Sequence, residues 1–86
     1  SPGQIVATRG VLEALTRSGE SPMRFVARHL LGDWGEPSED DARANESALR
    51  HGSRILSAYR TALGTRLWII TEADRSVTTV LLPEEY

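Results

Sequence analysis

Hydrophobic side chains in the first third of the chain recur every three or four residues, the spacing of an amphipathic helix. Hydroxyl residues that can cap a helix start each pattern at Thr8 and Ser21, and Gly19 and Gly32 end them. The pattern predicts helices from about residue 9 to 18 and from about 22 to 31. Their apolar faces contain Val11, Leu12 and Leu15 in the first and Met23, Val26, Ala27 and Leu30 in the second.

The next segment is polar and ends in a third helical pattern. Ser38 is followed by three acidic residues, which interact favourably with the helix dipole when they occupy a first turn. We predict a helix from there to about residue 51, closed by Gly52. Its apolar stripe offers mostly small side chains: Ala42, Ala44, Ala48 and Leu49. Such a stripe must pack closely against something flat, and a sheet face is the expected partner.

From residue 54 the period of the pattern changes from 3.6 to 2, which is typical of strands. Residues 66–72 and 77–82 predict two strands joined by a tight turn at Asp74-Arg75, with Pro83 ending the second. Residues 54–62 also alternate and predict a first strand, although the third helix could instead continue through them as far as Ala62. The last third of the chain is therefore expected to form an antiparallel β-meander.

The start of the chain adds one short element. Residues 4–7 are partly β-branched and predict an edge strand, whereas residues 1–3 are expected to be disordered or an expression remnant. At 86 residues the chain supports one hydrophobic core. The expected fold is a single α+β domain of residues 1–86, with about three short helices packed on a small antiparallel meander.

Composition excludes several classes of function. The chain contains no cysteine, which excludes disulfides, thiolate zinc sites and cysteine nucleophiles, and His51 has no ligand-spaced partner. A phosphate-binding glycine loop and a nucleophile elbow are also missing, so no metal and no cofactor are expected. The net charge of -2 argues against a protein that binds duplex DNA non-specifically.

The apolar runs of the chain are short. The longest are far below the ~20 residues that a membrane-spanning helix needs, and no secretory signal pattern opens the sequence. We expect a cytoplasmic protein with no membrane partner.

Side chains with useful chemistry gather near the end of the second predicted helix. Arg28 and His29 lie in its last turn, where the helix dipole favours a cation, and Asp33 and Trp34 follow shortly after. His29 is the residue best suited to general acid or base catalysis, as in a small metal-independent ribonuclease. In that hypothesis Arg60, Arg75, or Tyr59 and Thr78 on the sheet would stabilise a phosphate.

The predicted hairpin tip is a second candidate site. Asp74-Arg75, flanked by Glu72 and Ser76, would form an exposed ion pair or a loop that contacts an anion, although such residues are more often ordinary solvated turn residues. Together with Asp33 and Trp34, the residues Glu72, Asp74 and Arg75 are the predicted binding residues. An acidic stretch from residue 36 to 46 would suit a basic nucleic-acid-binding protein as partner.

Several short motifs, spread over nearly the whole chain, resemble a family of small bacterial proteins carried on plasmids, integrative elements and prophages. They are Arg28-His29, Gly32-Asp33-Trp34-Gly35, Asn45-Glu46, Ser57-Ala58-Tyr59, and the C-terminal blocks 68–75 and 78–86. Arg9 departs from the pattern, in which a proline is expected, and this affects only the entry into the first helix. The resemblance implies a mobile-element origin and no established reaction.

The leading hypothesis is a non-enzymatic accessory protein of a mobile genetic element that binds a macromolecular partner in defence or counter-defence. The partner is expected to be a protein rather than a nucleic acid. The alternatives are a ribonuclease or toxin-like enzyme that uses His29, and a homodimer in which an edge of the meander pairs across a twofold axis.

Overall fold

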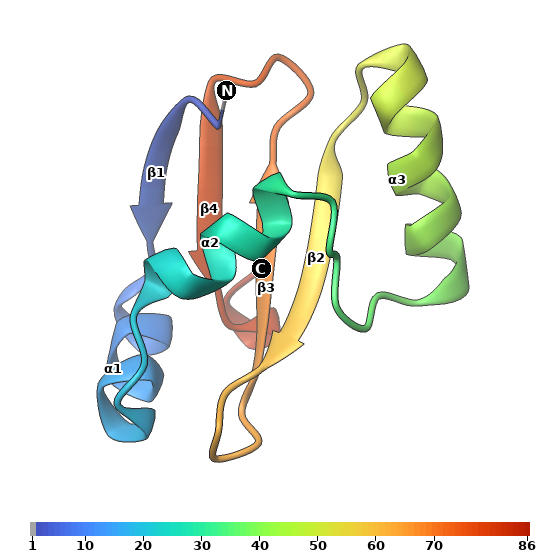
Figure 1. Ribbon diagram of the computed structural model, residues 1–86. Helices are drawn as coiled ribbons and strands as arrows, with labels where there is room; N and C mark the ends of the chain where they lie inside the picture. The colour runs from blue at the N-terminus through green and yellow to red at the C-terminus, as the bar shows by residue number, and fades with distance from the viewer. Residues whose placement is uncertain (1) are drawn as a thin grey trace.

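The computed structural model describes residues 2–86, which fold into one four-stranded mixed sheet with three helices (Figure 1). The strands are β1 (Gln4–Ala7), β2 (Ile55–Arg60), β3 (Arg66–Thr71) and β4 (Val77–Leu81). Their order across the sheet is β1-β4-β3-β2. The three C-terminal strands form the expected antiparallel meander, and β1 is added at its edge, parallel to β4.

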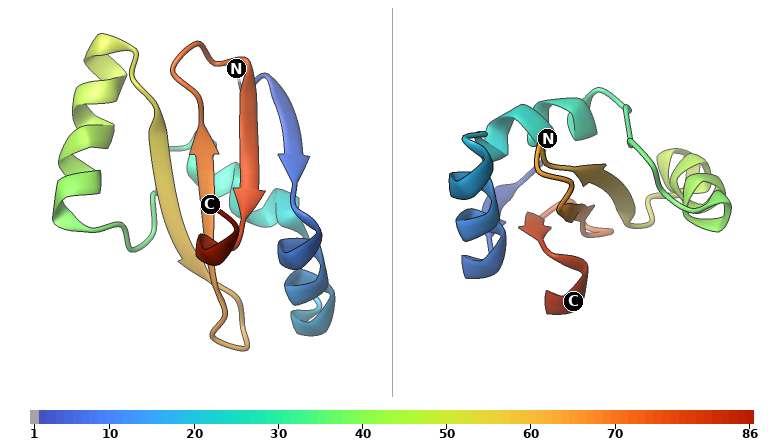
Figure 2. Two further views of the ribbon diagram at one scale, coloured as in Figure 1. Left: turned by 180° about the vertical axis from the view of Figure 1, so that it is seen from behind. Right: turned by 90° about the horizontal axis from the view of Figure 1, so that it is seen from below.

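Helices α1 (Arg9–Ser18) and α2 (Pro22–Leu30) cover one face of this sheet, as the view from below in Figure 2 shows. The core between them is apolar and fully buried: Val11, Leu15, Phe25 and Val26 from the helices meet Tyr59, Leu67, Ile69 and Val80 from the strands. The alternation in β3 is the reason, because residues 67, 69 and 71 of a strand share one face.

The opposite face of the sheet has a smaller cover. Leu56, Ile70 and Leu81 form a second buried cluster there, and Trp68 packs against it. The 3-10 helix η1 (Pro83–Glu85) brings the C-terminus to this face of the sheet (Figure 2). The Tyr86 ring meets the Trp68 ring edge-on, with 5.8 Å between the ring centres. Both faces of the sheet therefore make apolar contacts, but only one of them is covered by α-helices, α1 and α2.

The helix boundaries follow the capping pattern of the sequence. The side chains of Thr8, Ser21 and Ser38 accept hydrogen bonds from backbone N–H groups in the first turns of α1, α2 and α3 (Glu39–His51). Gly19 and Gly52 close α1 and α3 in the left-handed conformation. Residues 55–60 form a strand, so α3 does not continue through them.

Helix α3 lies beside β2 rather than over a sheet face, which corrects the sequence expectation (Figure 2). Of its predicted stripe only Ala48 is buried, and Leu49 is largely exposed. The other buried residue is Asn45, whose side-chain amide accepts from the Leu56 N–H at 2.8 Å and donates to the Leu56 carbonyl at 2.6 Å. This amide pairs with the outer edge of β2 as a neighbouring strand would, and so it draws the helix to the edge.

The connector after α2 covers the rest of that edge. The Ala58 N–H donates to the Trp34 carbonyl at 2.9 Å, and the Glu36 N–H donates to the Ala58 carbonyl at 2.7 Å. Gly35 lies between these bonds with φ 72°, and a Cβ there would stand 2.2 Å from the Ala58 carbonyl oxygen. Only glycine permits this approach, which leaves β2 with no free edge at Leu56 or Ala58.

The chain start is packed against the sheet over part of its length. Of residues 1–3, Ser1 lies outside the described residues, and Pro2 accepts a hydrogen bond from the buried Thr78 hydroxyl at 2.8 Å. Across residues 2–86, no helix combines the length and the hydropathy needed to cross a bilayer.

Candidate functional site

His29, the predicted catalytic residue, is buried in a chain of hydrogen bonds that we call the polar chain. Its Nδ1 lies 2.5 Å from the Ser57 hydroxyl, and its Nε2 lies 2.8 Å from the Thr71 hydroxyl. Thr71 in turn lies 2.8 Å from Thr78, which donates to the Pro2 carbonyl. All four side chains are almost inaccessible to solvent. The polar chain thus crosses the core from β2 to β4 beneath α2.

The direction of these bonds fixes the state of the imidazole. Because Thr78 gives its proton to a carbonyl, its oxygen accepts from Thr71, and the Thr71 oxygen accepts from the Nε2–H of His29. The remaining nitrogen, Nδ1, then accepts from Ser57. Burial lowers the pKa of His29 to about 4, which keeps the ring neutral at pH 7. Of the two basic residues in the last turn of α2, Arg28 is therefore the cation that the helix dipole favours, and His29 is not.

One edge of His29 reaches a pocket of about 330 Å³, which we call the α2–α3 hollow. Its walls are apolar and come from the end of α2, the connector, α3 and β2: Leu30, Leu31, Trp34, Leu49 and Ile55. His29, Thr71 and Arg75 supply its polar lining. We call the three exposed leucines at residues 30, 31 and 49 the leucine rim. The hollow therefore joins a buried polar floor, formed by His29 and Thr71, to a leucine rim.

Arg75 reaches the hollow from the predicted hairpin tip but does not pair with its neighbour Asp74. Its guanidinium donates to the Ser53 carbonyl at 2.6 Å and to the Glu72 carbonyl at 3.2 Å, next to the end of α3. Its backbone has a positive φ of 62°, which residues other than glycine and asparagine rarely adopt. The guanidinium thus ties the hairpin to the segment after α3 and places a positive charge at the hollow.

Asp33 and Trp34, both predicted binding residues, face different surroundings. The Arg28 Nε donates to the Asp33 carboxylate at 2.7 Å, which lowers the pKa of Asp33 and raises that of Arg28. The same guanidinium lies 4.5 Å from the centre of the Tyr59 ring, whose hydroxyl donates to the Asp33 carbonyl. Asp33 is therefore part of a surface cluster that holds the connector on the sheet, whereas Trp34 lines the hollow.

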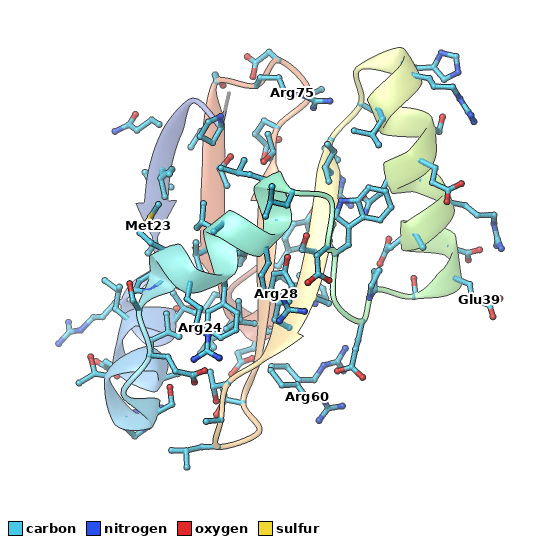
Figure 3. The ribbon with its side chains drawn as sticks, viewed as in Figure 1. Met23, Arg24, Arg28, Glu39, Arg60 and Arg75 are labelled. Carbon is cyan, nitrogen blue, oxygen red and sulfur yellow. The ribbon has the colours of Figure 1, made fainter. Side chains whose placement is uncertain are left out.

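Arg60, the predicted phosphate-binding partner of His29, lies elsewhere. It pairs with Glu36 at 3.3 Å and lines a separate surface hollow with Tyr59 and Arg66. Figure 3 shows Arg75 and Arg60 at opposite ends of the molecule, with Arg28 between them. Of the four residues His29, Asp33, Arg60 and Arg75, only His29 and Arg75 line one pocket.

The remaining predicted binding residues belong to local structure. Asp74 accepts from the N–H and the hydroxyl of Ser76, and these bonds lower the pKa of its carboxyl group. Glu72 is exposed on the other face of the sheet, where it borders a shallow hollow with Ile70 and Tyr86. Neither carboxylate lines the α2–α3 hollow. Within residues 2–86, no group of three or more histidine, aspartate or glutamate side chains is arranged to hold a metal ion.

The leucine rim and the partners of His29 are the features that sequence reasoning missed. Ser57, Thr71 and Thr78 are polar positions on a sheet face that is otherwise apolar, and such positions require a buried hydrogen-bond partner. That pattern is a signal for a polar helix residue above the sheet. Leu31 and Leu49 carry no comparable signal, because an apolar residue in a helical pattern is expected to be buried.

Comparison of the chain with family models, with curated proteins and with solved structures finds no match.

Proposed function

We propose that this protein is a non-enzymatic binding module that holds an apolar side chain of a protein partner in the α2–α3 hollow. The observation that carries the proposal is the exposure of the leucine rim: Leu31 is 86% exposed and Leu49 is 66% exposed, around a hollow that Trp34 also lines. Single exposed leucines are common on protein surfaces, but leucines grouped around a concave, tryptophan-lined pocket are typical of interaction sites.

Burial of the rim supplies a substantial part of the free energy of binding. Covering a fully exposed leucine side chain contributes about 1.5–3 kcal/mol, and Trp34 belongs to the residue type that most often dominates interface energetics. Two covered leucines and a partly covered tryptophan therefore contribute several kcal/mol, and contacts around the hollow must supply the rest of what is needed to offset the cost of association.

The electrostatics of the hollow favour an apolar partner side chain with an acidic neighbour. His29 is neutral, because burial holds its pKa at about 4, and its ring nitrogens are already bonded to hydroxyls. Arg75 is the cationic side chain in the lining; its guanidinium donates to the carbonyls of Ser53, Glu72 and Ala48, and it carries five N–H donors in total. A peptide with a bulky apolar residue next to a carboxylate matches this lining.

The alternative, a ribonuclease-like enzyme, receives less support from the geometry. A general base needs a lone pair within reach of its substrate, and the only lone pair of neutral His29 accepts from the buried Ser57 hydroxyl. Arg60 is engaged by Glu36 on another part of the surface. A test of RNA cleavage by wild type and His29→Gln separates the two functions: cleavage lost in the variant would favour the enzyme.

The biological setting is proposed from the sequence resemblance alone. The motifs from Arg28 to the C-terminal blocks are similar to those of small proteins encoded on mobile elements. In that setting, a small domain without a catalytic site acts by occupying a surface of a host or element protein, in defence or counter-defence. In this proposal the α2–α3 hollow is the surface through which the accessory protein would act.

Affinity capture with matched variants tests the proposed function. Wild type, the rim variant Leu31→Ser/Leu49→Ser, and the control Leu63→Ser are each used as bait in a bacterial host lysate. Leu63 is 68% exposed but lies in the β2–β3 turn, outside the residues that line the hollow. We expect one stoichiometric protein with wild type and with the control, and its loss with the rim variant.

Two outcomes would contradict the proposal. One is a protein that is captured equally well by all three baits, because its binding would not depend on the rim. The other is the absence of any stoichiometric protein with wild type under conditions in which the bait remains folded by circular dichroism.

A further inference from the structure

The two edge strands of the sheet, β1 and β2, differ in how far other groups cover them. At β2, the edge is covered by the Asn45 amide and by backbone bonds to Trp34 and Glu36. At the other edge, β1 pairs with β4 alone among the strands of residues 2–86. Its sequence contains no charge and no proline, the features that usually protect an edge strand. Ile5 and Val6 are 36% and 37% exposed. The sheet thus has one edge open to a further strand.

The hydrogen-bonding groups of this edge can be assigned from the parallel pairing. Gln4 and Thr8 donate their N–H groups to Ser76 and Val80, so even-numbered residues face β4. Successive residues of a strand point their backbone groups in opposite directions, and therefore Ile5 and Ala7 direct theirs outward. Ile5 and Ala7 thus each offer one N–H donor and one carbonyl acceptor at the open edge, and Val6 lies between them.

We propose that β1 pairs with β1 of a second copy of this chain, so that two sheets join into one eight-stranded sheet across a twofold axis. In the antiparallel register that uses the outward groups, Ile5 of each copy exchanges two hydrogen bonds with Ala7 of the other. Val6 then faces its own copy at the axis. The pairing forms four backbone hydrogen bonds and brings no two like charges together.

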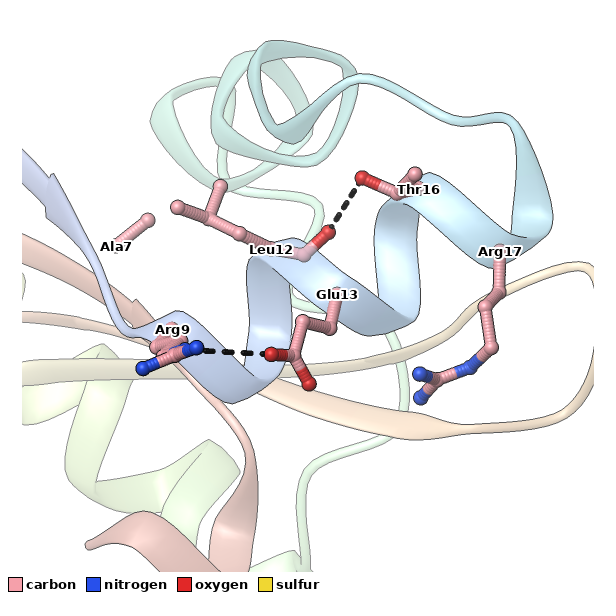
Figure 4. Close-up of a pocket in the computed structure, with 6 residues that line it drawn as sticks. All are labelled: Ala7, Arg9, Leu12, Glu13, Thr16 and Arg17. Atoms are coloured by element: carbon pink, nitrogen blue, oxygen red, sulfur yellow. Dashed lines mark hydrogen bonds and ion pairs between the residues drawn. The ribbon is translucent and has the colours of Figure 1, made fainter.

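Side-chain shape supports a second copy as the occupant. In this register the large Ile5 side chain lies over the small Ala7, on the face that carries α1 and α2. Ala7 lines a groove of about 620 Å³ together with Leu12, which is exposed, and the Arg9–Glu13 pair borders it (Figure 4). Ile5 of the partner enters this groove beside Leu12, and the twofold axis repeats the contact.

The closed edge at β2 limits the assembly to two copies. A sheet with two open edges propagates into fibres, whereas a sheet with one open edge is complete once that edge is paired. A β1 strand that is already ordered in each copy also loses less conformational entropy on pairing than a disordered peptide would. These two points favour a closed dimer over an open filament or a captured peptide.

Disulfide trapping tests the register, because the chain contains no cysteine of its own. In Val6→Cys the two thiols face each other at the axis in a non-hydrogen-bonded pair, a spacing that a disulfide can bridge. In the control Gln4→Cys the thiols lie about 13 Å apart along the strands, four residues at 3.3 Å each. We expect mild oxidation to link Val6→Cys into a dimer and to leave Gln4→Cys as monomer; equal cross-linking of both would overturn the proposal.

Sedimentation equilibrium tests the dimer without cross-linking. Wild type should approach twice the monomer mass at high micromolar concentration, and Ile5→Pro should remain monomeric, since proline removes an outward N–H and leaves the bonds to β4 intact. The control Leu63→Ser and the rim variant Leu31→Ser/Leu49→Ser, whose substitutions lie outside β1 and its groove, should still dimerise. A wild type that stays monomeric up to about 1 mM, or a folded Ile5→Pro that dimerises as wild type does, would overturn the proposal.

Discussion

The floor and the rim of the α2–α3 hollow reverse the usual distribution of residue types. The floor is polar and buried, with His29 and Thr71 only 5% and 4% exposed, whereas the rim is apolar and exposed. In the floor each side-chain polar group has a hydrogen-bond partner, so its residues specify the packing of α2 on the sheet. In the rim the leucines contribute little to folding and remain available to a partner. In our account the histidine and the hydroxyl residues of the floor stabilise the fold, whereas the leucines of the rim carry the proposed binding function.

The largest expected difference between floor and rim is in stability. We expect His29→Ala to lower the free energy of unfolding by about 3 kcal/mol, because it leaves a cavity and deprives the Ser57 and Thr71 hydroxyls of a partner. Urea denaturation at pH 7 measures this. The matched control is His51→Ala at the exposed end of α3, which should stay within about 0.5 kcal/mol of wild type. Equal effects of the two substitutions would remove the structural role assigned to the floor.

The second expected effect is on the pH dependence of stability. His29 has a folded pKa of about 4, below its ordinary value of 6.5, so the unfolded chain binds a proton first as the pH falls. The contribution of neutral His29 to the free energy of unfolding is therefore complete above about pH 6.5 and is lost as the pH falls towards 4. Between pH 7.5 and 5 the loss is on the order of 2 kcal/mol.

A difference measurement isolates this titration from other groups. Glu20, Asp33, Asp74 and Glu85 also have lowered pKa values, through hydrogen bonds, and their contributions are lost mainly below pH 4.5. Wild type and His29→Gln share those groups. The difference between their free energies of unfolding at each pH, measured with urea, therefore reports the titration of His29 alone. Parallel pH dependences in the two proteins would show that His29 is not held neutral by burial.

The smallest expected effect is that of the rim on folding. Leu31→Ser/Leu49→Ser should change the free energy of unfolding by no more than about 0.5 kcal/mol, because both side chains are already largely exposed. Urea denaturation against the Leu63→Ser control checks this. A loss above 2 kcal/mol would place the leucines in the folding core, and the contrast between floor and rim would then fail.

The sequence alone predicted the helices and strands whose signals lie within a few neighbouring residues. Caps at Thr8, Ser21 and Ser38 gave the helix starts, and the change to alternating residues after Arg54 gave the meander. These signals act over a few residues, so one sequence contains them in full. The additional strand at residues 4–7 was also expected.

The site depends on contacts that no local pattern contains. Ser57 and Thr71 are 28 and 42 residues from His29, and alternation says which strand face they share but not which helix residue lies above them. Asn45 covers the edge of β2 at Leu56 through its side-chain amide, and Trp34 and Glu36 cover it at Ala58 through backbone hydrogen bonds. As a result α3 lies beside β2 and not over the sheet face, where its alanines predicted it. Leu49 became exposed for the same reason.

The most direct test of the leucine rim is site-specific photo-crosslinking in a host lysate. A photoreactive amino acid is introduced in place of Leu49 in one variant and in place of Leu63 in another, since both positions are exposed leucines. Our account predicts a single covalent protein adduct from position 49 and none from position 63. An adduct that forms equally from both positions, or from position 63 alone, would contradict the claim that the rim of the α2–α3 hollow is the binding site.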